Sequence, residues 1–285
     1  MKYETNYTAE DSFVKRIAAL ILSLVMIFGM CTVAFAASKK LNYLVIGDSI
    51  AHGEGIANPG EACYGRMVAN TNGYNYRNLG IDGITTSDLL LLINSSSEMK
   101  SEIKKADIIS VSIGGNNFLR SNLLWLLVTI VFGNLDEVNK TADGIYDDLG
   151  KIIPAIKELN PDAVILMQTV YNPWKAAWIS GIYQKGVDAL NSAIRRYLKD
   201  NPGSYEIVDV AAAFAASDKD LIAADTIHPN GEGNKLIAKT VLKKLKQLGL
   251  GSKTEPVIAA EPIEKVSLSL DNNLRLIRYY LNTAA

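Results

Sequence analysis

Five short apolar runs alternate with segments of helical periodicity, and this alternation is the feature that most constrains the fold. The runs cover residues 43–47, 74–79, 108–113, 164–170 and 205–210. Strands that alternate with helices pair in parallel through right-handed crossovers. The run AVILMQTV, residues 163–170, is almost continuously apolar, as is typical of a strand covered on both faces. The sequence therefore predicts a three-layer α/β/α sandwich around a five-stranded parallel sheet.

Two helices near the carboxyl end are clear from their periodicity. From residue 179 to residue 198 apolar residues recur at helical spacing, and the pattern stops before Asn201-Pro202-Gly203. A final helix carries an apolar stripe from Ile237 to Leu248, opposite several lysines, and ends at Gly249. We interpret the lysines as a solvated helix face.

Composition and charge limit the class of partner. The chain has 285 residues, 48% of them hydrophobic and 21% charged, which is ordinary for a globular core. Its 29 basic and 30 acidic residues give a net charge of −1. Nucleic-acid binding needs a basic surface, so we expect no nucleic-acid partner.

The N-terminal segment predicts export. Residues 17–37 carry no charge, follow Lys15 and Arg16, and end in the small-residue pattern Ala34-Phe35-Ala36. This is the composition of a signal peptide, residues 1–36, cleaved near Ala36. The run is also long enough to span a bilayer, so an uncleaved anchor that tethers the protein to the membrane is the alternative. Both interpretations place the folded domain, residues 38–250, outside the cytoplasm.

Cleavage would leave Cys63 as the only cysteine, so we expect no internal disulfide and interpret Cys63 as a small buried apolar residue.

Two further segments fit the scheme less well. Residues 123–132 are apolar throughout, apart from one threonine, and predict either a buried helix or a lid that forms an acyl-binding wall. On the second interpretation Leu123, Trp125 and Leu127 would line a substrate pocket. Trp174 and Trp178, after the fourth predicted strand, could instead stack on a sugar in that pocket. Residues 251–285 are interpreted as a linker and a C-terminal tail of unknown structure.

Four polar clusters lie where predicted strands end or helices begin. They are GDS at 47–49, NLGIDG at 78–83, GGNN at 114–117 and DTIHPN at 225–230. In an open parallel sheet, ligands bind beyond the carboxyl ends of the strands, where such loops meet. We therefore expect the four clusters to form one site.

Ser49 could be a helix cap, a phosphate ligand or a nucleophile. A nucleophilic serine needs a base, and the chain has only two histidines, His52 and His228. His52 is three residues from Ser49, where a helical turn would point its ring away. His228 has Asp225 three residues before it to hold one tautomer, which makes His228 the better candidate.

Acyl transfer also requires hydrogen-bond donors that face the developing oxyanion. The residues present offer the backbone amides of Ser49 and Gly80 and the side-chain amide of Asn116.

Taken together and in this order, the four clusters resemble the four sequence blocks of the SGNH, or GDSL-type, esterases and lipases. The resemblance covers about residues 41–248 and implies a flavodoxin-like sandwich. It further implies that Ser49 attacks an ester, that His228 is general base and then acid, and that Asp225 orients His228. Ser49, Gly80 and Asn116 would form the oxyanion hole. Two positions differ from the family pattern: Ile50 replaces leucine, and Asn117 replaces a common aspartate.

Other functional classes have less support. A metal site built from His52, His228, Asp48 or Glu54 would be short of ligands, so we expect no metal and no cofactor. The expected substrate is a lipid or lysophospholipid acyl ester. The alternatives are O-deacetylation of a cell-wall or plant glycan and, in another class, a non-catalytic surface binding module. The oligomeric state is left open.

Overall fold

The computed structural model describes residue 16 and residues 19–21, 40–120, 133–174 and 178–265. It divides into two compact units, residues 1–40 and residues 41–285. In the first unit only the helical residues 16 and 19–21 and residue 40 are described, so most of the predicted signal or anchor segment lies outside the described residues. Within the part of the chain that is described, no helix is both long and apolar enough to cross a membrane.

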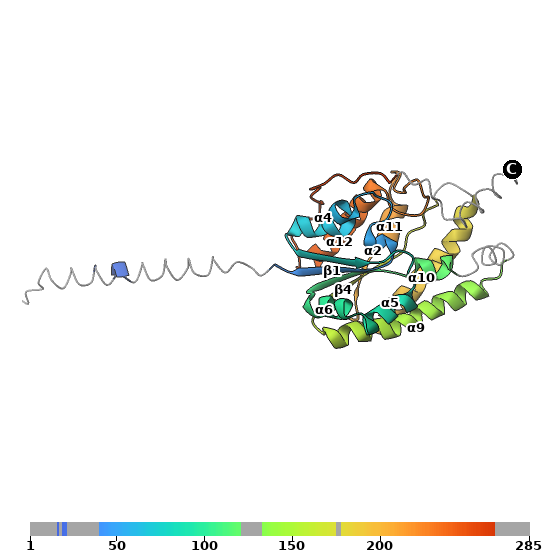
Figure 1. Ribbon diagram of the computed structural model, residues 1–285, viewed down its shortest axis with the longest axis horizontal. Helices are drawn as coiled ribbons and strands as arrows, with labels where there is room; N and C mark the ends of the chain where they lie inside the picture. Colours follow the sequence, from blue (N-terminus) through green and yellow to red (C-terminus); the bar gives the residue numbers. More distant parts are fainter. Residues whose placement is uncertain (1–15, 17–18, 22–39, 121–132, 175–177, 266–285) are drawn as a thin grey trace, which may run out of the picture. The chain divides into compact units, whose positions relative to one another are not determined.

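The second unit is built on a five-stranded sheet with the order β2-β1-β3-β4-β5, in which all neighbouring strands are parallel (Figure 1). The strands are β1 (Asn42–Gly47), β2 (Asn75–Gly80), β3 (Ile108–Ser112), β4 (Val164–Gln168) and β5 (Glu206–Val208). The predicted parallel sheet is therefore confirmed. The predicted fifth strand is too long at its end, because Asp209 caps the helix that begins at Val210.

Helices cover both faces of the sheet (Figure 1). Side chains alternate between the faces along a strand. In β1, Leu44 and Ile46 join one apolar core and Tyr43 and Val45 join the other. The first core lies against α5 (Thr86–Ser95), α6 (Ser97–Lys105), α9 (Asp136–Leu159) and α10 (Trp178–Asp200), and the second against α4 (Tyr64–Asn72), α11 (Val210–Ala215) and α12 (Gly231–Gln247). The three-layer α/β/α sandwich is confirmed.

Three short helices lie at the ends of the layers: α2 (Ser49–His52), α3 (Pro59–Ala62) and α7 (Gly115–Leu119). Two of them, α2 and α7, directly follow the central strands β1 and β3. They begin with residues of the GDS and GGNN clusters, so the register of β1 against β3 places these clusters next to each other.

Residues 251–265, which we call the C-terminal strap, contact the segment of the domain that follows α2. The Asn58 side chain donates to Glu261 O and accepts from Ile263 N, at 3.0 and 2.9 Å. Lys265 then forms an ion pair with Glu54. The described part of the expected linker and tail is thus held against the domain by several polar contacts.

Candidate active site

The turn that follows β1 depends on a glycine. Gly47 has a φ of +128°, and a Cβ at this position would lie 1.8 Å from the carbonyl oxygen of Ser112. Only glycine avoids both the strained backbone and the clash. The turn brings the backbone N–H of Asp48 to the same Ser112 oxygen, at 2.9 Å. The strand end and the first residues of α2 are thereby held to β3.

Asp48, not Ser49, is the N-cap of α2. One carboxylate oxygen of Asp48 accepts hydrogen bonds from Ile50 N at 3.1 Å and Ser112 Oγ at 3.2 Å. Burial raises the pKa of Asp48 to about 6, against the opposing effect of these bonds. The cap function considered for Ser49 therefore belongs to its neighbour, and the Ser49 hydroxyl is available for another partner.

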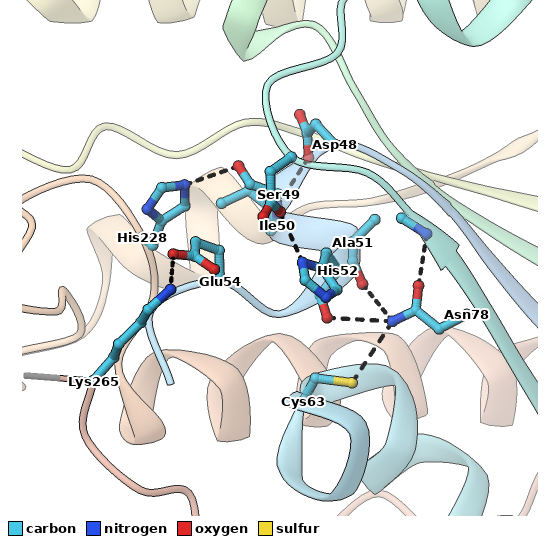
Figure 2. A network of polar contacts seen from close by, with 12 residues as sticks. Asp48, Ser49, Ile50, Ala51, His52, Glu54, Cys63, Asn78, His228 and Lys265 are labelled. Atoms are coloured by element: carbon cyan, nitrogen blue, oxygen red, sulfur yellow. Dashed lines mark hydrogen bonds and ion pairs between the residues drawn. The ribbon is translucent and has the colours of Figure 1, made fainter. Parts of the chain in front are cut away.

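That partner is His228 (Figure 2). Ser49 Oγ lies 2.8 Å from His228 Nε2, and His228 Nδ1 lies 2.8 Å from Asp225 Oδ2. Because a carboxylate can only accept, Nδ1 carries a proton and Nε2 can accept the proton of the serine hydroxyl. The three side chains form a continuous hydrogen-bonded chain, as in serine hydrolases.

A strained loop holds Asp225 and His228 in this relation. Asp225 Oδ1 accepts the backbone N–H groups of Ile227 and His228 at 3.0 and 2.9 Å, which leaves Oδ2 for the imidazole. Thr226 has a φ of +70°, which is unfavourable for a β-branched residue. Burial raises the pKa of Asp225, but the hydrogen bonds from His228 and the backbone outweigh it, so the pKa is lowered overall.

Two residues not singled out from the sequence support this loop. A Cβ on Gly55 would lie 2.9 Å from His228 Cβ and 2.5 Å from Pro229 O, so the backbone of Gly55 lies directly against the histidine. Tyr171 donates its hydroxyl to Ile227 O at 2.7 Å. The glycine in the string HGEG could have indicated the contact of Gly55 with His228. No local sequence pattern indicates the hydrogen bond of Tyr171.

Gly80 lies at the end of β2, but its amide is already hydrogen-bonded. Gly80 N–H donates to Asn78 Oδ1 at 2.8 Å. Asn78 Nδ2 in turn donates to Ala51 O at 2.9 Å (Figure 2). A Cβ on Gly80 would lie 2.3 Å from the backbone nitrogen of His52. This glycine therefore permits β2 to approach α2 closely, and it is not among the described residues that line the cavity.

The second glycine of the same cluster, Gly83, does line the cavity and has a φ of +76°. Among the described residues we find no acceptor for its N–H. Sequence inspection did not select it, although NLGIDG contains both glycines. Asn116 also lines the cavity and donates one of its two side-chain N–H groups to Ile84 O at 3.0 Å.

Asn117, which departs from the family pattern, has a local structural function. Its side chain accepts from Thr86 N at 3.1 Å and donates to Thr86 Oγ1 at 2.8 Å. These two bonds connect α7 to the first turn of α5. The neutral amide thus keeps the segment that carries Asn116 in place without a charge.

A cavity of about 320 Å³ opens beside Ser49 and His228, which is within the size range of small-molecule sites. Much of its wall is apolar, formed by Ile50, Phe118, Leu119, Val170, Tyr171, Pro173, Ile182, Tyr183, Val187, Leu190 and Ile227. Trp174 is half-buried and is not among the described residues on this wall. Leu123, Trp125 and Leu127 lie outside the described residues.

His52 does not face Ser49; its Nδ1 lies 2.8 Å from Asp82 Oδ1. His52, Asp82 and Glu54 bring possible metal-ligand atoms within 4.8 Å of one another. Lys265 contacts Glu54 and His52 contacts Asp82, so both carboxylates are paired with groups of this chain. We assign no metal to this group.

Comparison with known proteins places the chain in a family. The sequence matches the GDSL-like Lipase/Acylhydrolase family over residues 45–236. It is 30% identical to the uncharacterized protein YpmR of Bacillus subtilis (strain 168) in an alignment of 264 residues that covers 82% of this chain and 98% of that protein. It is 24% identical to the spore germination lipase LipC of Bacillus licheniformis in an alignment of 174 residues that covers 59% of this chain and 75% of LipC.

A solved lipase structure from a goat rumen metagenome shares the fold, with a TM-score of 0.59 and 20% identity over 75% of this chain and 99% of that one. The chain belongs to the GDSL-like lipase and acylhydrolase family. It is accordingly a carboxylic ester hydrolase.

Proposed function

We propose that Ser49 is the nucleophile of this hydrolase and that hydrolysis proceeds through an acyl-enzyme. His228 Nε2 takes the hydroxyl proton as Ser49 Oγ attacks the ester carbonyl, and then gives it to the departing alkoxide. Water, activated by the same imidazole, releases the acid and restores the serine. The observation that carries this proposal is the chain of two 2.8 Å contacts from Ser49 through His228 to Asp225.

Asp225 orients the imidazole and stabilises the imidazolium that forms during attack. Its lowered pKa supports this function, because the carboxylate is ionised at neutral pH. The two backbone hydrogen bonds to Oδ1 hold the carboxylate plane, so the histidine keeps one tautomer.

The oxyanion is stabilised by the amide of Ser49 and the side chain of Asn116, as the sequence suggested. We assign the third donor to the amide of Gly83 in place of Gly80, because Gly83 lines the cavity and the Gly80 amide is bonded to Asn78. Each such donor contributes about 3–4 kcal/mol to transition-state stabilisation.

The substrate is an ester of a lipid or lysophospholipid acyl chain. The apolar wall of the cavity favours a hydrocarbon chain, since burying each methylene contributes about 0.8 kcal/mol. Trp174, the tryptophan that could stack on a sugar ring, is not among the described residues that line the cavity.

The enzyme acts outside the cytoplasm. The support for this is residues 17–37, an uncharged run that follows Lys15 and Arg16 and has the composition of an export signal or anchor. N-terminal sequencing of the protein recovered from culture medium and from membranes distinguishes cleavage near Ala36 from a retained anchor.

The function is tested with the purified chain, p-nitrophenyl esters of two to twelve carbons and a fluorophosphonate probe. We expect hydrolysis and covalent labelling in the wild type, and the loss of both in Ser49→Ala. Folded wild-type protein that neither hydrolyses these esters nor reacts with the probe would refute the proposal.

A further inference from the structure

The α10 side of the cavity contains a glycine where an apolar side chain would be expected. Ile182, Tyr183, Val187 and Leu190 of α10 line the cavity, at the spacing of one helix face. Gly186 lies in the middle of this stripe and also lines the cavity. The apolar stripe of α10 is therefore interrupted at Gly186, next to the cavity.

Neither the backbone nor close packing requires glycine at this position. Gly186 lies inside a helix and is not among the described residues with positive φ. A Cβ there would have Phe118 Cδ1 as its nearest neighbour among the described residues, at the ordinary contact distance of 3.9 Å. Gly114, by contrast, has a φ of +114° and would place a Cβ 3.2 Å from Leu190 Cδ1.

Glycine is also the least favourable helix residue after proline, so its presence inside α10 costs stability. No local requirement offsets this cost. Compared with alanine or leucine, glycine at position 186 leaves additional volume open in the cavity. This volume lies between α10 and Phe118 of α7, and Phe118 is two residues from Asn116, the proposed oxyanion donor. A chain bound there would begin close to the reacting carbonyl.

We propose that Gly186 determines the acyl-chain length that the enzyme accepts. The inference rests on the function proposed above and adds the residue that sets the substrate range. The acyl chain runs between α10 and Phe118, and a side chain at position 186 would occupy the space of its distal methylenes. Each methylene excluded from an apolar site lowers kcat/KM about fourfold.

The test measures kcat/KM for p-nitrophenyl esters from C2 to C12 in the wild type, Gly186→Ala and Gly186→Leu. Gly181→Leu is the matched control, because Gly181 is an exposed position of the same helix and a Cβ there meets no described atom within 4 Å. We expect Gly186→Leu to lower the C8-to-C2 ratio roughly 10- to 100-fold. Gly186→Ala should lower it less and raise Tm by about 2–4 °C.

A second measurement does not depend on turnover. In the Ser49→Ala background, octanoate should raise Tm by binding the cavity, and the added Gly186→Leu substitution should abolish this shift. The proposal is overturned if Gly186→Leu leaves the C8-to-C2 ratio of kcat/KM unchanged, whether or not both values of kcat/KM fall. Wild-type protein without esterase activity would instead refute the proposed function itself.

Discussion

The two walls of the cavity are built in opposite ways. On the side of α2 and the loop at 225–228, directional hydrogen bonds fix Ser49, His228 and Asp225. On the side of α10 and α7, apolar side chains surround an open volume, and burial raises the pKa of Tyr183 to about 12, so its phenol stays neutral. We call the first the polar wall, because hydrogen-bond geometry defines it. We call the second the apolar wall, because it encloses an open volume.

Because of this difference, we expect substitutions on the polar wall to have abrupt effects on activity and substitutions on the apolar wall to have graded effects. Removing one member of a hydrogen-bonded catalytic chain removes a step of proton transfer. Altering an apolar wall instead changes the binding free energy by the contribution of each methylene gained or lost. Substitutions on the polar wall test this contrast most severely.

The largest effect is expected for His228, the proposed catalytic base. His228→Ala should lower kcat by about 10⁴-fold or more, because among the residues that the structure describes no other group is hydrogen-bonded to Ser49 Oγ to accept its proton. Asp225→Asn should lower it on the order of 10²- to 10⁴-fold by disturbing the imidazole tautomer. Steady-state kinetics on a short ester check both, with circular dichroism as the control for folding. Wild-type turnover in His228→Ala would contradict the assignment.

A large but smaller effect is expected for the glycine behind the histidine. Gly55→Ala should lower kcat roughly 10- to 100-fold, because its Cβ would displace His228 by a fraction of an ångström or more. Gly60→Ala is the matched control, since Gly60 is exposed and a Cβ there meets no described atom within 4 Å. If both variants keep wild-type kcat, the packing of Gly55 against His228 is not needed for catalysis.

The next effect concerns the stability contributed by Asp48, the buried N-cap of α2. The folded-state pKa of Asp48 is about 6, raised from 3.8, so its stabilising contribution is complete below pH 3.8 and is lost as the pH rises through 6. Asp48→Asn keeps an acceptor oxygen for Ile50 N but carries no charge. Its stability relative to the wild type should therefore improve by about 3 kcal/mol between pH 3.5 and pH 8.

Urea unfolding at these two pH values measures the change. A constant difference between Asp48→Asn and the wild type across this range would show that the Asp48 carboxylate ionises normally in the folded protein.

The smallest effect is expected at the rim, where the C-terminal strap meets the polar wall. The Lys265 side chain is 43% exposed and Glu54 is 21% exposed, so solvent screens their ion pair. Lys265→Ala should cost no more than about 1 kcal/mol of stability and change kcat less than Gly55→Ala does. Thermal unfolding at low and high salt checks this. A loss as large as that of the glycine variant would mean that the strap itself positions the catalytic loop.

The contrast between the walls also explains what could be predicted. The strands, the pairing of Ser49 with His228 and the support from Asp225 followed from polar clusters at the ends of parallel strands, which must converge at one edge. The sequence did not distinguish Gly83 from Gly80 because the two lie only three residues apart, at the end of β2 and in the loop after it, and only the path of that loop determines which amide reaches the cavity. The contact of Gly55 with His228 joins residues far apart in the chain, and no local pattern reports it.

By itself, the sequence determined the α/β/α layers, the family and the class of ester hydrolase, because hydrophobic periodicity and the order of the polar clusters are local properties of the chain. The tertiary structure decided which glycine faces the cavity, that Asp48 and not Ser49 caps α2, and that Gly186 leaves open space next to Phe118. These features depend on distances between elements remote in sequence, and such distances arise only when the layers pack together.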